Sequence, residues 1–241
     1  MYSRVFERYY NNDPDVIMFF EPSVWPDIMP YFGGVIRPVG FDTPPGGSFG
    51  SRNHVLNDHT YCCQLNLTVC ASGEPSTDLA EECYAWHEKR IGTRRADADN
   101  LGLPLIISEF GACLTEASCT QEIRQVTEVS DQYLAGWAYW EFKSFEDLTT
   151  SAGVGAEGFY NKDGSLQDFK VKALSRTYLM ATQGVLLTNV FDMDTSKFSA
   201  TFKVDSVNIQ KPSIIYTNRQ YYYPNGYKTS VSVDGVELTS D

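Results

Sequence analysis

The stretch 104-PLIISEFGAC-113 places a carboxylate almost directly after an apolar run. Leu105, Ile106 and Ile107 form the run, and Glu109 follows after a single serine. Consecutive large aliphatic residues are typical of a strand that is buried on both faces, as in a parallel sheet. A carboxylate at the edge of such a strand loses hydration free energy unless it is paired, hydrogen-bonded or open to water. Two interpretations therefore stand: a strand end that reaches solvent, or a functional carboxylate.

Composition limits the class of protein. The chain has 241 residues, of which 42% are hydrophobic and 14% aromatic, so it is long and apolar enough for one or two globular domains. A net charge of −12 argues against nucleic-acid binding, which needs a basic surface. The basic pairs Lys89-Arg90 and Arg94-Arg95 are expected on a solvated helix face. No run of 18 apolar residues could span a membrane.

The six cysteines predict disulfide bonds and not a metal site. Their spacing suits short disulfide-closed loops between 62/63 and 70 and between 113 and 119, and lacks the C-x2-C pairs of zinc sites; the cysteines are Cys62, Cys63, Cys70, Cys83, Cys113 and Cys119. A glycosylation sequon at Asn66 agrees with a secretory compartment. Residues 1–13 lack the apolar segment of a signal peptide, so we expect a longer parent protein that is secreted or lysosomal.

Strand and helix patterns alternate along residues 1–184, which predicts parallel strands joined by crossover helices. We expect strands at 15–20, 54–63, 105–109 and 134–142, and helices at 2–10, 77–98, 119–133 and 166–182. Polar or aromatic residues gather at the strand C-termini, where the catalytic residues of a (β/α)8 barrel converge; these are Glu21, His59, Tyr61, Glu109 and Trp140. A barrel needs eight strands, and this pattern supplies four.

Residues 185–241 have no helical periodicity and predict an antiparallel β module. Short alternating runs occur at 198–203 and 229–233, with turn sequences at 224–226 and 234–235. The last strand of this module stops early, so we expect the module to be truncated.

The residues at the strand ends suit glycoside hydrolysis with retention. That reaction uses two carboxyl groups about 5 to 5.5 Å apart, one as the nucleophile and one as the acid/base. A tyrosine hydroxyl such as that of Tyr61 can stabilise the charged nucleophile by donating a hydrogen bond. His59 can donate to a sugar hydroxyl or to the carboxylate, and Trp140 can offer an aromatic face to a pyranose ring. For each of these three residues, ordinary packing in a strand remains the alternative.

Several motifs, in order, resemble glycoside hydrolase family 5, and within it the endoglycoceramidase and glycosylceramidase-like branch. They are PLIISEFG at 104–111, HTY at 59–61, GWAYWEFK at 136–143, FFEP with Trp25 at 19–25, the Gly- and Pro-rich loop after it, and YYPNG in the last module. The resemblance covers essentially the whole chain. It implies the C-terminal half of a (β/α)8 TIM barrel, strands five to eight, in residues 1–184, and a C-terminal β-sandwich in residues 185–241.

The resemblance also implies roles for single residues. Glu109 would be the nucleophile on strand seven, with His59 and Tyr61 on strand six and Trp140 on strand eight; Glu21, Trp25 and Lys143 would support substrate binding. The family carries its acid/base Glu in an Asn-Glu-Pro on strand four, and the chain has no Asn-Glu-Pro. Phe20-Glu21-Pro22 imitates this motif but lies where strand five belongs. We therefore expect the acid/base to be absent from this chain, and the chain to be inactive alone.

Three hypotheses follow. The first is a retaining β-glycosidase that cleaves a glycosphingolipid or a related β-glucoside, with loop 31–47 in peripheral contact with membrane lipid. The second is a non-catalytic fragment or degenerate paralogue that binds carbohydrate or glycolipid. The third makes Glu21 the acid/base of a complete site. None requires a cofactor, a metal, a nucleic acid or an obligate protein partner.

Overall fold

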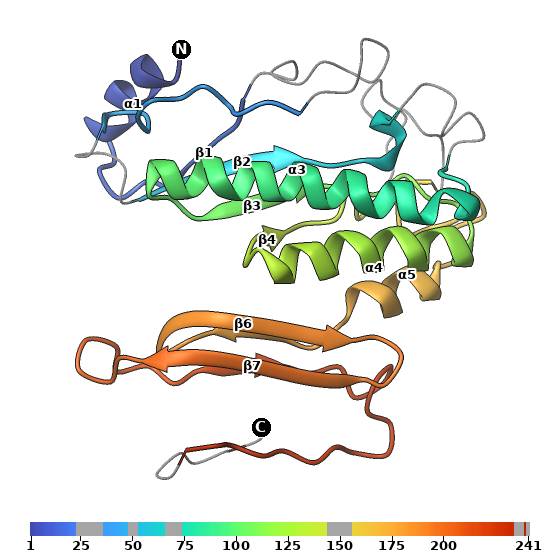
Figure 1. Ribbon diagram of the computed structural model, residues 1–241. Helices are drawn as coiled ribbons and strands as arrows, with labels where there is room; N and C mark the ends of the chain where they lie inside the picture. Colours follow the sequence, from blue (N-terminus) through green and yellow to red (C-terminus); the bar gives the residue numbers. More distant parts are fainter. Residues whose placement is uncertain (23–35, 48–52, 66–73, 144–155, 234–238, 240–241) are drawn as a thin grey trace.

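Four parallel strands form the central sheet, in the order of the sequence. They are β1 (Met18–Phe20), β2 (His54–His59), β3 (Leu105–Glu109) and β4 (Gly136–Trp137). The computed structural model describes residues 1–22, 36–47, 53–65, 74–143, 156–233 and 239 (Figure 1). Parallel strands in sequence order with helices between them confirm the predicted (β/α)8 arrangement, of which the described residues hold four strands.

Three of the four strands are shorter than expected, and β1 begins at Met18 instead of residue 15. β2 ends at His59, because Tyr61 leads into the short 3-10 helix η3 (Cys62–Gln64). β4 has two residues, although its continuation still follows β3: the Ala138 amide donates to the Ile107 carbonyl at 2.9 Å. The regular strands thus end at or before the candidate functional residues, and single backbone hydrogen bonds continue the pairing beyond them.

The helices α3 (Ala80–Leu101) and α4 (Glu116–Gln132) lie side by side on one face of the sheet (Figure 1). The helix α1 (Tyr2–Tyr10) matches the expected helix, and α3 follows directly on the 3-10 helix η4 (Thr77–Leu79). Thr115 caps α4 by accepting a hydrogen bond from the Ser118 amide, so this helix begins earlier than expected.

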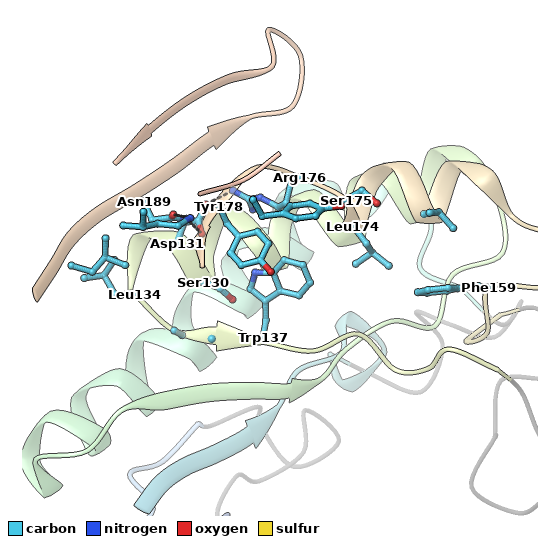
Figure 2. Close-up of a pocket in the computed structure, with 16 residues that line it drawn as sticks. Ser130, Asp131, Leu134, Trp137, Phe159, Leu174, Ser175, Arg176, Tyr178 and Asn189 are labelled. Carbon is cyan, nitrogen blue, oxygen red and sulfur yellow. Dashed lines mark hydrogen bonds and ion pairs between the residues drawn. The ribbon is translucent and has the colours of Figure 1, made fainter. Parts of the chain in front are cut away.

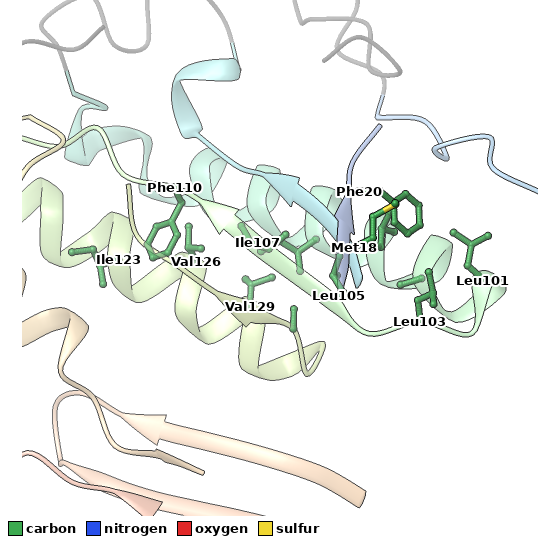
Figure 3. Packing of buried hydrophobic residues seen from close by; sticks show 14 of the residues in the cluster. Met18, Phe20, Leu101, Leu103, Leu105, Ile107, Phe110, Ile123, Val126 and Val129 are labelled. Atoms are coloured by element: carbon green, nitrogen blue, oxygen red, sulfur yellow. The ribbon is translucent and has the colours of Figure 1, made fainter. Parts of the chain in front are cut away.

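The hydrophobic core lies between the sheet and these two helices. Figure 3 shows side chains of β3 and the residue after it pointing at one face of α4. The members of this layer are at most 3% exposed, and they are Leu105, Ile107, Phe110, Ile123, Val126 and Val129. The apolar run at 105–107 therefore lies at the centre of the core, as its composition predicts.

The expected solvated face of α3 is confirmed for Lys89, which is exposed, and is wrong for Arg90 and Arg94. Arg90 and Arg94 are buried, and both guanidinium groups bind the buried carboxylate of Asp58 on β2. Arg90 also donates to the His59 carbonyl at 2.6 Å. Charged residues on a helix usually face solvent, but two arginines can be buried when a strand supplies a carboxylate opposite them. This cluster ties α3 to the end of β2.

One expected disulfide is confirmed, and a second bond joins a pair that the spacing did not indicate. Cys113 is bonded to Cys119, which closes the loop before α4. Cys62 is bonded to Cys83 on α3. Cys63 is disulfide-bonded as well. Cys70, the other end of the loop expected from 62/63, lies outside the described residues, so that loop stays a prediction.

The last helix is much shorter than expected. It is α5 (Asp168–Leu174), and the chain then forms β5 (Tyr178–Ala181) where a helix to 182 was predicted. Arg176 is buried between them and pairs with Asp131 of α4, an interaction that outweighs the helical propensity of the segment. The next strand begins at Gly184.

Antiparallel sheets follow the barrel elements, as predicted. The strands β6 (Gly184–Asp192) and β7 (Lys197–Val204) form a hairpin, and β5 pairs with β8 (Ile214–Tyr216). The predicted turn at 224–226 is confirmed by a hydrogen bond from the Gly226 amide to the Tyr223 carbonyl. The predicted strand at 229–233 is wrong, since these residues form no strand. The domain boundary after residue 184 stays a prediction.

None of the helices in the described part of the chain is long and apolar enough to cross a bilayer.

We predict that Asp58→Asn lowers the free energy of unfolding by about 3 to 5 kcal/mol, because it removes the buried negative charge that the guanidinium groups of Arg90 and Arg94 share. The matched control is Asp99→Asn: Asp99 also pairs with an arginine of α3, but its side chain is 68% exposed, so the change should cost about 1 kcal/mol or less. Urea unfolding followed by circular dichroism measures both. Equal losses in the two variants would contradict the assignment.

Candidate active site

Glu109, the last residue of β3, faces a hydrogen-bond donor from the neighbouring strand end. The Tyr61 hydroxyl donates to Glu109 Oε1 at 2.7 Å. The Glu109 side chain is 25% exposed, so it is neither buried nor free in solvent. This geometry agrees with the predicted pairing and leaves one carboxylate oxygen for other partners.

His59 lies between two carboxylates. Its Nδ1 is 3.6 Å from Glu109 Oε2, and its Nε2 is 3.4 Å from Glu21 Oε2. Glu21 also accepts a hydrogen bond from Asn57 Nδ2 at 3.0 Å. An imidazole ring therefore occupies the space between Glu21 and Glu109. In a retaining glycosidase the sugar lies between the two catalytic carboxyl groups, so this arrangement favours a supporting role for Glu21.

Trp140 follows β4, and its backbone is hydrogen-bonded to the segment that follows Glu109. Its amide donates to the Phe110 carbonyl at 2.9 Å, and Gly111 forms a bridge with it. A Cβ atom at Gly111 would lie only 2.5 Å from the Trp140 carbonyl oxygen, and the φ of 153° at this position also favours glycine. Glycine after Glu109-Phe110 thus lets the two strand ends approach closely.

Behind the strand ends lies a buried polar layer that the sequence analysis missed. Thr60 Oγ1 is 2.8 Å from His87 Nδ1, and His87 Nε2 is 3.1 Å from Glu122 Oε1. Glu122 Oε1 in turn accepts from the Cys62 amide at 3.4 Å. Residues 60 to 62, with Tyr61 at their centre, are therefore held by side chains of α3 and α4. These helix residues carry no local motif that would mark them.

Glu157 is a second carboxylate near Glu109 that sequence analysis did not single out. It is only 4% exposed and accepts a hydrogen bond from the Trp140 side chain. Burial, followed by the negative charges of Glu141 and Glu109, raises the pKa of Glu157 from 4.5 to about 7. Burial and the hydrogen bond to Glu109 raise the pKa of Tyr61 far above its ordinary value of 10.0.

Other predicted site residues are placed as follows. Lys143 is exposed, three residues beyond Trp140. Trp25 and Asn66 lie outside the described residues, as does part of the loop at 31–47. The described part of this loop binds α3: the Val39 amide donates to Asp97 Oδ2 at 3.1 Å, and Arg94 Nη1 donates to the Arg37 carbonyl at 2.8 Å.

One group of possible metal ligands comes together among the described residues, but its chemistry does not suit a metal ion. Among the described residues, the sulfur atoms of Cys62 and Cys83 and a carboxylate oxygen of Glu122 lie within 4.8 Å of one another. The two sulfurs are joined as a disulfide, which lacks the thiolates that bind metals.

A pocket of about 540 Å³ lies away from these residues (Figure 2). It is lined by the start of β4, by α4 and α5, and by β5 and β6. Trp137 and Tyr178 point into it, but Glu109, His59 and Tyr61 do not line it. We place the candidate active site at the strand ends, because the carboxylates and their donors meet there.

Two segments of the chain match domains of one sequence family. Residues 28–146 match Cellulase (glycosyl hydrolase family 5), and residues 176–241 match the Glycoside hydrolase family 5 C-terminal domain. The chain belongs to glycoside hydrolase family 5. This agrees with the resemblance seen in its motifs and with the position of Glu109 at the end of a barrel strand.

Curated relatives and solved structures agree with the family. An endoglycoceramidase from Cyanea nozakii is 25% identical over 214 residues, which are 89% of this chain and 37% of that protein. Endo-glycoceramidase II from Rhodococcus sp., solved as a lactosyl-enzyme intermediate, has a TM-score of 0.61 and 21% identity over 93% of this chain and 44% of that one. Sterylglucosidase 1 from Cryptococcus neoformans has a TM-score of 0.61 and 15% identity, and the match covers 89% of this chain and 36% of that one. The structural similarities support the fold.

The chain spans little more than a third of the length of the curated relatives that it matches.

We predict that the Tyr61 hydroxyl stays protonated in the folded protein at least to about pH 11, one unit above the ordinary tyrosine pKa. An alkaline titration that follows tyrosinate absorbance should therefore give the same curve for the native protein and for Tyr61→Phe. After denaturation in guanidinium chloride, the native sequence should show one more tyrosinate than the variant. A difference of one tyrosinate between the folded proteins below this pH would contradict the prediction.

We also predict that Glu157 makes the protein less stable as the pH rises from about 4.5 to about 7. In this window the folded state keeps the Glu157 proton and the unfolded state loses it, so the free energy of unfolding falls with pH. The full effect is on the order of 3 kcal/mol. Glu157→Gln should be more stable relative to the native protein at pH 8 than at pH 4.5, measured by urea unfolding. A pH-independent difference between the two proteins would contradict it.

Proposed function

We propose that this chain supplies the nucleophile side of a retaining β-glycosidase that acts on a glycosphingolipid or a related β-glucoside. The observation that carries the proposal is the Tyr61 hydroxyl at 2.7 Å from Glu109 Oε1, with His59 beside the other carboxylate oxygen. A phenol that does not ionise is a permanent donor, and it stabilises the charged form of a carboxylate. The family and the relatives named above support a glycosidase of the endoglycoceramidase type.

In this mechanism, a Glu109 carboxylate oxygen attacks the anomeric carbon and forms a glycosyl ester, while the aglycone leaves with the electron pair of its C–O bond. Water then attacks the same carbon and releases the sugar and Glu109. A lactosyl-enzyme intermediate, as named for the relative from Rhodococcus sp., is a species that only this two-step route forms. The route needs no metal or cofactor.

The departing oxygen of a natural aglycone also needs a proton, which an acid/base carboxyl supplies. Among the described residues, Glu21 and Glu157 are the carboxylates linked most directly to the site. Glu21 shares an imidazole with Glu109, and Glu157 is buried behind Trp140, so neither faces Glu109 across an open space. We therefore propose that the chain by itself does not turn over natural glycolipids.

The geometry of the strand ends keeps one alternative open, which is carbohydrate binding without catalysis. It requires the exposed parts of His59 and Trp140 but no second carboxylate, and the arrangement around Glu109 agrees with it.

An activated substrate separates the two functions. Dinitrophenolate leaves without protonation, so a dinitrophenyl β-glucoside needs only the nucleophile to glycosylate the enzyme. We predict release of about one dinitrophenolate per chain, together with one added hexose on the peptide that contains Glu109, found by mass spectrometry. Glu109→Gln should lose both. Glu81→Gln, a matched change on the exposed face of α3, should keep both.

Three other outcomes would change the proposal. If the chain binds the β-glucoside but neither releases phenolate nor becomes labelled, its function is carbohydrate binding without catalysis. Labelling of a residue other than Glu109 would refute its role as the nucleophile. Turnover of a natural glycolipid by the 241-residue chain that is lost in Glu21→Gln would instead make Glu21 the acid/base.

We further propose that the protein matures in the secretory pathway. The bonds Cys62–Cys83 and Cys113–Cys119 support this, because disulfides persist in oxidising compartments.

A further inference from the structure

Glu157 occupies a buried position directly behind Trp140. Its carbonyl accepts a hydrogen bond from the Glu141 amide at 2.9 Å, which fixes its backbone beside the residue that follows Trp140. Its carboxylate accepts the hydrogen bond of the Trp140 indole. The second carboxylate oxygen, Oε2, is buried and has no hydrogen-bond partner among the residues that the structure describes. A buried carboxylate with an unpaired oxygen is unfavourable, so this position calls for a compensating role.

Lys170 of α5 holds the segment that carries Glu157. Its side chain is fully buried, and Nζ donates to the Ala156 carbonyl at 2.9 Å and to the Gly158 carbonyl at 3.0 Å. These are the residues on either side of Glu157. One ammonium group therefore fixes the backbone before and after the carboxylate, and the orientation of the Glu157 side chain follows from it. The same ammonium lies 6.0 Å from the centre of the Tyr139 ring.

We propose that Glu157 is a positioning residue for the sugar-binding site: it holds the Trp140 indole through the ring N–H, and Lys170 holds Glu157. The inference rests on the proposed function in so far as Trp140 contacts the sugar. It adds a residue pair that comes from the segment after β4 and from α5, and that touches no substrate itself. The hydrogen bond fixes the rotation of the indole, so the aromatic face keeps one orientation towards the strand ends.

The charges around Glu157 make this contact depend on pH. Glu141 and Glu109 repel its negative charge, Lys170 attracts it, and the phenols of Tyr61 and Tyr139 also lie within its field. The pKa of Glu157 is about 7, so its carboxyl group is neutral in mild acid and charged in mild base. Hydrogen bonds to a charged acceptor are stronger than those to a neutral one. The indole is therefore held more firmly above pH 7 than below it.

The test follows the indole N–H of Trp140 by nitrogen-15 NMR in the full chain, with the resonance assigned by its loss in Trp140→Phe. Between pH 5 and 9 the resonance should move downfield with a midpoint of about 7. Glu157→Gln keeps the size of the side chain and an oxygen acceptor but cannot ionise. In this variant the shift with pH should disappear. Glu81→Gln, on the exposed face of α3, should leave the titration unchanged.

A second variant tests the support from α5. Lys170→Gln removes the positive charge and keeps a single amide donor in place of the ammonium. The midpoint should rise, because Glu157 loses its attractive partner, and the indole resonance should broaden as the segment loosens. A titration that persists in Glu157→Gln, or an indole resonance in the native chain that does not respond to pH, would overturn the proposal.

Affinity for a β-linked disaccharide gives a functional measure at one pH. Glu157→Ala should weaken binding about tenfold, the equivalent of one hydrogen bond, and Glu157→Gln should restore it. Equal losses in both variants would refute positioning through the indole hydrogen bond. If the chain binds no sugar, the proposed function fails while the NMR titration still stands, so the two failures are distinguishable.

Discussion

The parallel pairing of β2 with β3 is the constraint on which the candidate site depends. The two strands run in the same direction, and a register shift between Asp58 and His59 brings His59 opposite Glu109. The Thr60 amide then donates to the Glu109 carbonyl at 3.0 Å, so pairing continues past the last residue of the strand. Without this extension, the Tyr61 hydroxyl would not be held within hydrogen-bond distance of the Glu109 carboxylate.

The end of β2 is in turn fixed by buried charges. Asp58 lies between two guanidinium groups of α3, and one of them also binds the His59 carbonyl. Buried ion pairs contribute little net stability compared with apolar packing, but each one tolerates only a narrow geometry. In this protein they set the position of a strand end to which a helix is already attached by Cys62–Cys83. Rigid support of this kind is what a carboxylate and its donor need.

The site concentrates acids in a chain that is already strongly negative. Glu21, Glu109, Glu141 and Glu157 lie in this region. Its hydrogen-bond donors include His59 and Tyr61 at Glu109, His59 and Asn57 at Glu21, and Trp140 at Glu157. Repulsion among carboxylates is reduced when hydrogen bonds hold each one and when one of them stays protonated. Glu157 is the carboxyl group that holds its proton to the highest pH of those with a raised pKa here, because burial raises its pKa to about 7.

The sequence by itself determined the alternation of strands and helices, the apolar core of β3 and the carboxylate at its end, since each of these is written in neighbouring residues. It also indicated Tyr61 and His59, because the ends of parallel strands meet at one edge of a sheet. The burial of Arg90 and Arg94, the length of α5 and the place of Glu157 were decided by the tertiary structure. Each of these depends on a partner distant in the sequence, Asp58, Asp131 or Trp140, and a local pattern holds no information about which distant charge a side chain will meet.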